Sequence, residues 1–168
     1  MFRFYNTAHL RTGFTLIEMM TVIVIIVTLI AISAFGLTGG FEAGRDTRRR
    51  SDLRQLQLAV EKSSNDNSGL YPSRTSSSVA KTTTCQTDLG YTASECPDDP
   101  KYESGDTSWP RYRYRSNGTG SGNDNATQFI LWARLEDVST TTWLVVCSNG
   151  VTGVTTTAPT GASGACPL

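Results

Sequence analysis

Four acidic side chains crowd one short segment in the second half of the chain: Asp98, Asp99, Glu103 and Asp106. Carboxylate oxygens at irregular spacing can hold Ca²⁺. A solvated acidic turn explains the same residues, and their spacing favours it over a complete ligand loop. A structural calcium ion is therefore a hypothesis for this segment, and the chain is otherwise expected to need no cofactor.

Arginine and tyrosine alternate from Arg111 to Arg115. Such a run could stack on single-stranded nucleic acid and neutralise its phosphates. In a strand, however, successive side chains point to opposite faces, which favours tyrosines in a core and arginines in water. The whole chain has 15 basic and 15 acidic residues, a balance that argues against a general polyanion binder. Nucleic acid is not an expected partner.

The acidic and arginine–tyrosine segments belong to a chain that combines one long apolar segment with a polar remainder. Residues 14–37 are apolar, with Glu18 as their one charged side chain. As a helix they would extend about 36 Å, enough to cross a hydrocarbon core of roughly 30 Å. Arg3 and Arg11 precede the segment and favour a cytoplasmic N-terminus, although the arginines of 45–50 oppose that orientation. A cleaved secretory signal peptide is an alternative, but its apolar region is usually only about 7–15 residues.

Glu18 needs an explanation, because a carboxylate within an apolar span costs roughly 2.5–3.5 kcal/mol on insertion scales. It could simply stay hydrated or protonated near the membrane interface. The residues from Gly13 to Glu18 read Gly-Phe-Thr-Leu-Ile-Glu and run directly into the apolar segment. Together with the short basic leader, this string resembles the processing site of type IV prepilins and of the pseudopilins of type II secretion systems.

The resemblance implies a specific maturation pathway. A membrane-embedded prepilin peptidase would cut between Gly13 and Phe14 and methylate the new amine of Phe14. In that family the glutamate, here Glu18, neutralises the terminal amine of a neighbouring subunit. Its role would be to set the register of assembly, because a slip leaves both charges unpaired in a low dielectric. The implied partners are other pilin subunits, the peptidase, the assembly platform protein and its ATPase, and membrane lipid before assembly.

One feature departs from the family pattern. Many type IV pilins carry a proline about two-thirds along the membrane segment, where this chain has Ala34-Phe35-Gly36. Local unwinding on assembly would have to use Gly36, Gly39 and Gly40. Removal of the leader would also take away His9, the only histidine. A mature chain without histidine excludes Ser-His-Asp and Cys-His catalysis and histidine-ligated zinc. We therefore do not expect an enzyme.

Four cysteines remain in a segment that we expect to be exported: Cys85, Cys96, Cys147 and Cys166. An even number in an oxidising compartment favours disulfides. Three pairings are open in principle. Cys85–Cys96 with Cys147–Cys166 is favoured, because each bond then clamps a loop-rich segment locally. No pair has the C-x-x-C spacing of a zinc site.

The rest of the chain predicts a stem and a small head. Leu53, Leu56, Ala59 and Val60 form one stripe of an amphipathic helix that should end within 65–69. The Arg48–Arg50 run could bind anionic lipid or nucleic acid, but a solvated helix face or contacts to a neighbouring subunit are favoured. Residues 73–108 have an irregular, loop-like composition. Strands are expected over 110–115, 127–135, 141–147 and 150–156.

The expected fold class is α+β: a long N-terminal helix, with a membrane half and an amphipathic half, packed against a small antiparallel sheet. Its segments are a leader (1–13), a transmembrane and polymerisation helix (14–40), a stem helix with its exit turn (41–72) and a loop-rich β head (73–168). The resemblance to pilins is strong over 14–72 and moderate over 98–136. Major pseudopilins often hold structural calcium in a comparable loop, which strengthens the calcium hypothesis.

The resulting functional hypothesis is a structural subunit of a type IV pilus or a type II secretion pseudopilus. It predicts a single-pass precursor in the cytoplasmic membrane and later an extracytoplasmic or cell-surface filament. The sequence leaves open which of the two systems applies, whether the subunit is major or minor, and whether it is glycosylated. A membrane-anchored extracytoplasmic binding domain is the alternative from a different class, and an exported enzyme is poorly supported.

Overall fold

The structure is a computed structural model that describes residues 13–34, 37–136, 140–159 and 164–168. The predicted leader before Gly13 and the predicted hinge residue Gly36 lie outside the described residues. The chain divides into two compact units, one ending at Thr38 and the other beginning at Gly39.

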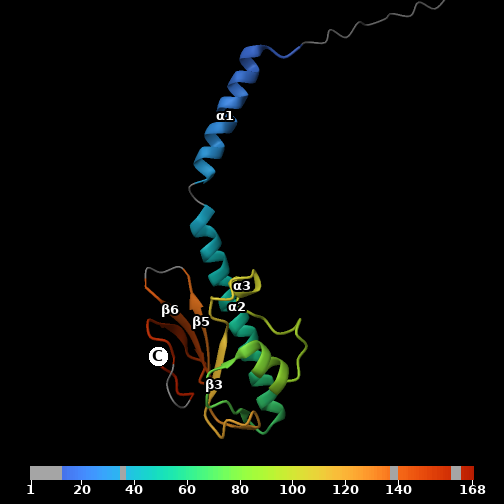
Figure 1. The fold of residues 1–168 in the computed structure, drawn as a ribbon, viewed down its shortest axis with the longest axis vertical. Coiled ribbons are helices and arrows are strands. Elements are labelled where there is room, and N and C mark those ends of the chain that lie inside the picture. Colours follow the sequence, from blue (N-terminus) through green and yellow to red (C-terminus); the bar gives the residue numbers. More distant parts are fainter. Residues whose placement is uncertain (1–12, 35–36, 137–139, 160–163) are drawn as a thin grey trace, which may run out of the picture. The chain divides into compact units, whose positions relative to one another are not determined.

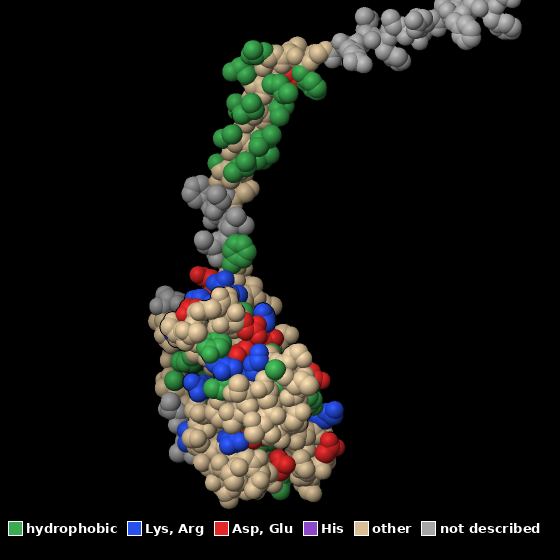
Figure 2. All heavy atoms as spheres, turned by 45° about the vertical axis from the view of Figure 1, so that its right-hand side comes forward, with side chains coloured by type: hydrophobic (Ala, Val, Ile, Leu, Met, Phe, Trp, Pro, Cys, Tyr) green, Lys and Arg blue, Asp and Glu red, His purple; other side chains and the backbone are tan. Residues whose placement is uncertain are grey.

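The first unit contains the helix α1 (Leu16–Ala34). Within the described residues, Leu16–Ser33 is long and apolar enough to cross a membrane, and none of it is buried against the rest of the protein. Hydrophobic side chains line the face of α1 that is visible in Figure 2. This confirms the predicted apolar helix.

The second long helix is α2 (Leu37–Asp66), which includes Gly39 and Gly40 in regular helix. Leu53, Leu56 and Val60 of the predicted stripe are buried, while Ala59 is only partly buried. The chain leaves α2 through Ser68 and Gly69, whose φ angles are 58° and 81°. The amide of Gly69 donates to the carbonyl of Ser64 at 2.7 Å and so satisfies one of the last carbonyls of the helix.

The head is built on a five-stranded antiparallel sheet in the order β2-β3-β5-β6-β7 (Figure 1). Its strands are β2 (Ser78–Val79), β3 (Arg113–Ser116), β5 (Phe129–Leu135), β6 (Thr142–Cys147) and β7 (Thr152–Thr155). A separate antiparallel pair joins β1 (Tyr71–Pro72) to β4 (Asp124–Ala126). The α+β class and the four predicted strands are confirmed, with β3 starting three residues later than predicted.

One face of the sheet makes the main core with α2. Tyr114, Leu131 and Val146 stand side by side across three strands and are almost fully buried with Leu53 and Leu56. The hydroxyl of Tyr112 donates to Oδ2 of Asp52 on α2 at 2.8 Å. The predicted inward orientation of the tyrosines is thus confirmed, and the polar end of each buried ring has a partner.

The opposite face carries a smaller apolar cluster: Ile130, Trp132, Val145 and Cys147, with Trp143 and Cys166 packed against it. Cys166 belongs to the C-terminal tail, so the tail covers part of this face. A Cβ at Gly153 of β7 would lie 3.1 Å from Cδ1 of Leu168. Glycine at this position therefore lets the end of the tail lie close against the strand.

The prediction that 73–108 is irregular throughout is wrong. A π-helix, η1 (Ala80–Asp88), follows β2, and a short helix, α3 (Pro100–Glu103), follows the first disulfide. The run Thr82–Thr84 has poor helix propensity because β-branched side chains lose freedom in a helix. Burial of Ala80, Thr84 and Cys85 outweighs that propensity here. Asp99 caps α3 by accepting from the amide of Lys101 at 2.9 Å, and Pro100 occupies its first turn.

Candidate functional site

The N-terminus of α1 is defined by Thr15. Its hydroxyl accepts a hydrogen bond from the amide of Glu18 at 3.3 Å, and its carbonyl accepts one from the amide of Met19. Thr15 therefore occupies the N-cap position, with Glu18 three residues later, the spacing of a capping box. Glu18 lies in the first turn, where the helix dipole favours a negative charge.

The peptide bond between Gly13 and Phe14 precedes this cap. Gly13, Phe14 and Thr15 have no regular secondary structure, and the side chain of Phe14 is 77% exposed. A Cβ added at Gly13 would meet no atom within 4 Å. Nothing in the described chain covers this bond, and nothing there requires glycine at position 13. A requirement for glycine must come from a protein that binds the segment.

The hydroxyl side chains of α1 form hydrogen bonds with backbone carbonyls of the same helix. The hydroxyls of Thr21, Thr28 and Ser33 donate to the carbonyls of Glu18, Ile25 and Leu29 at 2.8–2.9 Å. Such bonds let hydroxyls enter hydrocarbon without unpaired donors. Glu18 has no ion pair within the described part of the chain, and exposed Ile17 and Met19 flank it. It is thus the one charged group of an otherwise apolar surface.

The acidic side chains named as possible calcium ligands contact basic or hydroxyl side chains in the head. Asp98 holds the guanidinium of Arg111, with Nη2 to Oδ2 at 2.6 Å, and Glu103 holds that of Arg48 at 2.6 Å. Asp106 accepts from the hydroxyl of Ser108 at 2.5 Å. Each carboxylate thus has its own partner. The described residues contain no group of three or more acidic, histidine or cysteine side chains arranged to hold a metal ion.

Asp99, the fourth member, belongs to a buried ion-pair cluster around Arg49 of α2. Arg49 is completely buried and lies 2.7 Å from Asp99, 2.5 Å from Asp46 and 2.6 Å from Glu136. We call these four side chains the Arg49 cluster. Arg45 adds a second cation, with Nη2 to Oε2 of Glu136 at 2.5 Å. The cluster therefore ties α2 to the segment before α3 and to the end of β5.

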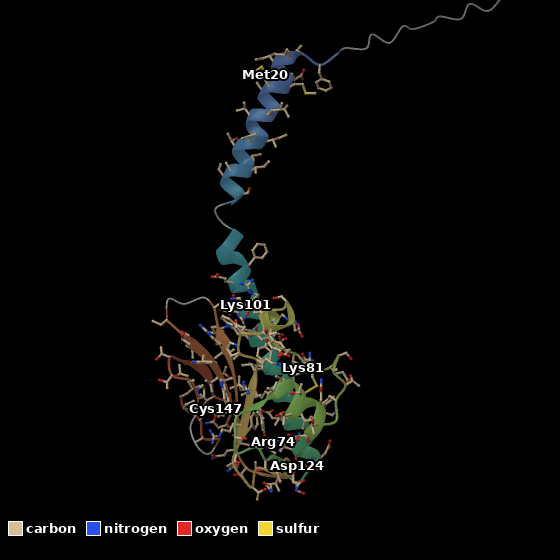
Figure 3. The ribbon with its side chains drawn as sticks, viewed as in Figure 1. Met20, Arg74, Lys81, Lys101, Asp124 and Cys147 are labelled. Atoms are coloured by element: carbon tan, nitrogen blue, oxygen red, sulfur yellow. A yellow bond between two sulfur atoms is a disulfide. The ribbon has the colours of Figure 1, made fainter. Side chains whose placement is uncertain are left out.

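The charge of Glu136 responds to this arrangement. Burial works to raise its pKa, but hydrogen bonds from Arg45 and Arg49 outweigh burial and lower the pKa to about 2. Trp109 lies beside the cluster, with the guanidinium of Arg49 5.1 Å and the ammonium of Lys101 4.1 Å from its ring centre. Figure 3 shows Lys101 beside α2, on the short helix α3.

The interpretation of Arg48–Arg50 as a solvated face is wrong for Arg49. Arg48 and Arg50 are exposed, as predicted, but Arg49 points into the head. The spacing of Asp46 and Arg49 predicts a local pair. Nothing local identifies Asp99 or Glu136, because both approach from distant parts of the chain.

The structure contains both favoured disulfides. Cys85 is bonded to Cys96 and Cys147 to Cys166, with Cα atoms 5.9 and 5.6 Å apart. The first bond joins η1 to the segment before α3. The second fastens the tail to the end of β6, where Figure 3 marks Cys147.

The N-terminal part of the chain is similar to a known family motif. Residues 9–34 match a family model described as a prokaryotic N-terminal methylation motif, the prepilin-type signature. The match spans the exposed Gly13–Phe14 bond, the Thr15 cap, Glu18 and all of α1. Neither a curated protein nor a solved structure matches the chain significantly. The chain thus carries a prepilin-type methylation motif on a membrane-capable helix that precedes a disulfide-bonded α+β head.

Proposed function

We propose that this protein is a structural subunit of a type IV pilus or a type II secretion pseudopilus, made as a membrane-anchored precursor and polymerised through its N-terminal helix. The observation that carries the proposal is the coincidence of the methylation motif with an uncovered Gly13–Phe14 bond and a separately capped helix. A peptidase could reach that bond without unfolding α1.

Cleavage at this bond creates a charge with which Glu18 can pair. Cutting creates an amine on Phe14, which is protonated near neutral pH. The apolar surface of α1 offers neither charge a partner, and two such charges attract strongly in a low dielectric. Packing the helices so that Glu18 of one subunit meets the amine of the next neutralises both. This pairing makes the subunit's role mechanical, with no catalytic step of its own.

The proposal implies several partners. The prepilin peptidase acts first, and lipid surrounds α1 until assembly. The assembly platform protein and its ATPase then move subunits into a homo-polymer outside the cytoplasmic membrane. The two disulfides fit a head that matures in an oxidising compartment.

The direct test is mass spectrometry of the N-terminus of the mature chain. Methylated Phe14 is expected. An intact Met1, or a cut near Ala34, would overturn the proposal and indicate an uncut anchor or an ordinary signal peptide.

A second test separates a filament subunit from an anchored binding domain. Glu18→Val should leave the chain inserted and its head disulfide-bonded, yet abolish filaments or secretion. Thr21→Val is the matched control, because it changes a neighbouring polar side chain of α1 that only bonds within the helix. Equal filament yield from both variants would contradict the assembly role of Glu18.

A further inference from the structure

A shallow groove runs between α2 and the β6–β7 side of the sheet. It consists of two adjoining hollows of about 210 and 300 Å³ that share Arg50. Apolar side chains of the sheet line it: Leu135, Leu144, Val146 and Val154. Leu135, Leu144 and Val146 are buried in the main core, whereas Val154 of β7 is 52% exposed, so the core ends at β7.

The rim of the groove is cationic. Arg50 and Arg54 are one turn apart on α2 and are both exposed. Neither forms an ion pair within the residues that the structure describes, unlike Arg45, Arg48 and Arg49 on the same helix. Two arginines without ion pairs beside the exposed side chain of Val154 have the composition of a protein contact.

The other flank of α2 carries the complementary charge. Residues 92–95 are exposed and follow partly buried Tyr91, and the amide and hydroxyl of Thr92 both donate to Oε2 of Glu95, at 2.9 and 2.7 Å. These hydrogen bonds lower the pKa of Glu95, so it is ionised at neutral pH. No cation pairs with it in the described part of the chain.

The Arg50–Arg54 groove and the turn that ends in Glu95 lie beside the same part of α2. Nε2 of Gln55 lies 3.5 Å from the carbonyl oxygen of Glu95, and Gln55 is the neighbour of Arg54. Gln55 and Glu95 line a separate hollow with Tyr91, Cys85 and Leu58, outside the Arg50–Arg54 groove. Lys62 also lines this second hollow. One flank of the stem therefore presents two arginines, and the other presents Glu95 together with Lys62.

We propose that the Arg50–Arg54 groove receives the 92–95 turn of a second copy of this chain, with Glu95 placed between the two arginines. The contact deepens the proposed function and rests on it, because it assigns the interface between heads in the filament. It joins two different surfaces, so a subunit that binds one neighbour through its groove keeps its own turn free to bind the next. Such contacts build helical or ring assemblies instead of closed pairs.

The contact can be trapped chemically in full-length protein. Arg54→Lys keeps the charge and supplies an amine that a zero-length carbodiimide couples to a carboxylate in contact with it. We expect covalent dimers and longer ladders from sheared filaments, with Lys at position 54 joined to Glu95 in the dimer band by peptide mass spectrometry. Adding Glu95→Gln should remove the ladder.

Charge reversal gives an independent measurement. Arg54→Glu and Glu95→Arg should each lower filament yield by about fivefold, the scale of one lost exposed pair repeated along a polymer. The double variant restores the pairing in reverse and should recover most of the yield. Arg113→Glu, which alters a charge outside both surfaces, should leave the yield unchanged.

The outcomes separate this proposal from the filament proposal. Filaments that form normally but give no 54–95 link, with equal yields for all three single reversals, would overturn the groove contact alone. Missing filaments together with a 54–95 link in membranes would overturn the filament role and support self-association through the groove. Absence of the link from both preparations would overturn the groove contact whatever the state of the filaments.

Discussion

Nε of Arg49 donates a hydrogen bond to Oδ2 of Asp99 over 2.7 Å, and neither side chain has any exposure to solvent. The two residues come from α2 and from the segment that begins α3, so one buried ion pair joins the stem to the part of the head that composition alone describes as a loop. Asp46 and Glu136 complete the compensation of the Arg49 charge.

Replacing Arg49 should therefore destabilise the head strongly. Arg49→Met removes the guanidinium but leaves buried carboxylates facing one another, and losing one partner of a buried pair costs about 3–5 kcal/mol. Urea unfolding of the full chain in detergent, followed by near-ultraviolet circular dichroism, measures the change. Arg48→Met is the control: the Arg48 side chain is 50% exposed, so its loss should cost less than about 1 kcal/mol. Equal losses would contradict the special role of Arg49.

Stability should also depend on the ionisation of Glu136. Its pKa is about 2 in the folded chain, below the ordinary value of 4.5, so the folded state favours the charged form. This contribution is fully present above about pH 5 and is lost as the pH falls toward 2, with a size on the order of 3 kcal/mol. Unfolding titrations from pH 6 to 2 should show the loss in the native chain and a flatter curve for Glu136→Gln. Parallel curves would argue against the shift.

Chelation should leave the melting temperature unchanged. The carboxylates proposed for calcium are engaged instead: Asp98 with Arg111, Asp99 with Arg49, and Glu103 with Arg48 and Lys81. Thermal unfolding with EDTA and with added Ca²⁺ should superimpose. A clear fall with EDTA, or protection from protease by Ca²⁺ alone, would restore the calcium hypothesis for 98–106.

The disulfide between Cys147 and Cys166 should hold the tail against the sheet. The double serine variant at these positions should cost about 2–4 kcal/mol and expose the tail. Limited digestion by proteinase K should then remove the C-terminal residues before the head is cut. The matched variant lacking Cys85 and Cys96 should lose similar stability but keep its tail protected. Early loss of the tail from both variants would indicate general unfolding.

Gly13 should matter for processing and not for folding. Gly13→Val adds side-chain atoms where the chain has no neighbour within 4 Å, so insertion and head formation should proceed. The processed fraction should nevertheless fall by roughly tenfold or more, the scale on which a binding pocket rejects a misfitting group. Gly40→Val is the control, since a Cβ at Gly40 also meets nothing. Intact mass measurement reports the uncut leader, and normal cutting of Gly13→Val would remove the glycine requirement.

Local sequence patterns predicted the two long helices, most strands and the disulfides, because these depend on residues that are close in sequence. The stripe Leu53, Leu56 and Val60 gave the buried side of α2, and alternation around Tyr112 and Tyr114 gave the direction of both rings. The disulfides followed from their loop-rich surroundings. The helix and strand inferences concern residues that one element places together, and the disulfide inference concerns cysteines that are close in sequence.

What sequence reasoning missed depends on distant contacts. Arg49 lies within a run of three arginines, and only the fold shows that Asp99 and Glu136 surround it. The helix η1 has a poor local propensity and forms because one side of it is buried. The Arg50–Arg54 groove likewise forms between α2 and strands that are distant in the chain, with Val154 of β7 left exposed. Composition and local spacing do not predict contacts between residues that are far apart in the sequence.

The cap at Thr15 has a consequence for the energetics of maturation. Both atoms that terminate α1, the hydroxyl and the carbonyl of Thr15, come from residues on the mature side of the Gly13–Phe14 bond. Precursor and product therefore share the same helix end. Under the proposed function, leader removal changes the charge of the terminus and leaves its conformation intact, so that a subunit waits in the membrane as a finished helix until one covalent bond is cut.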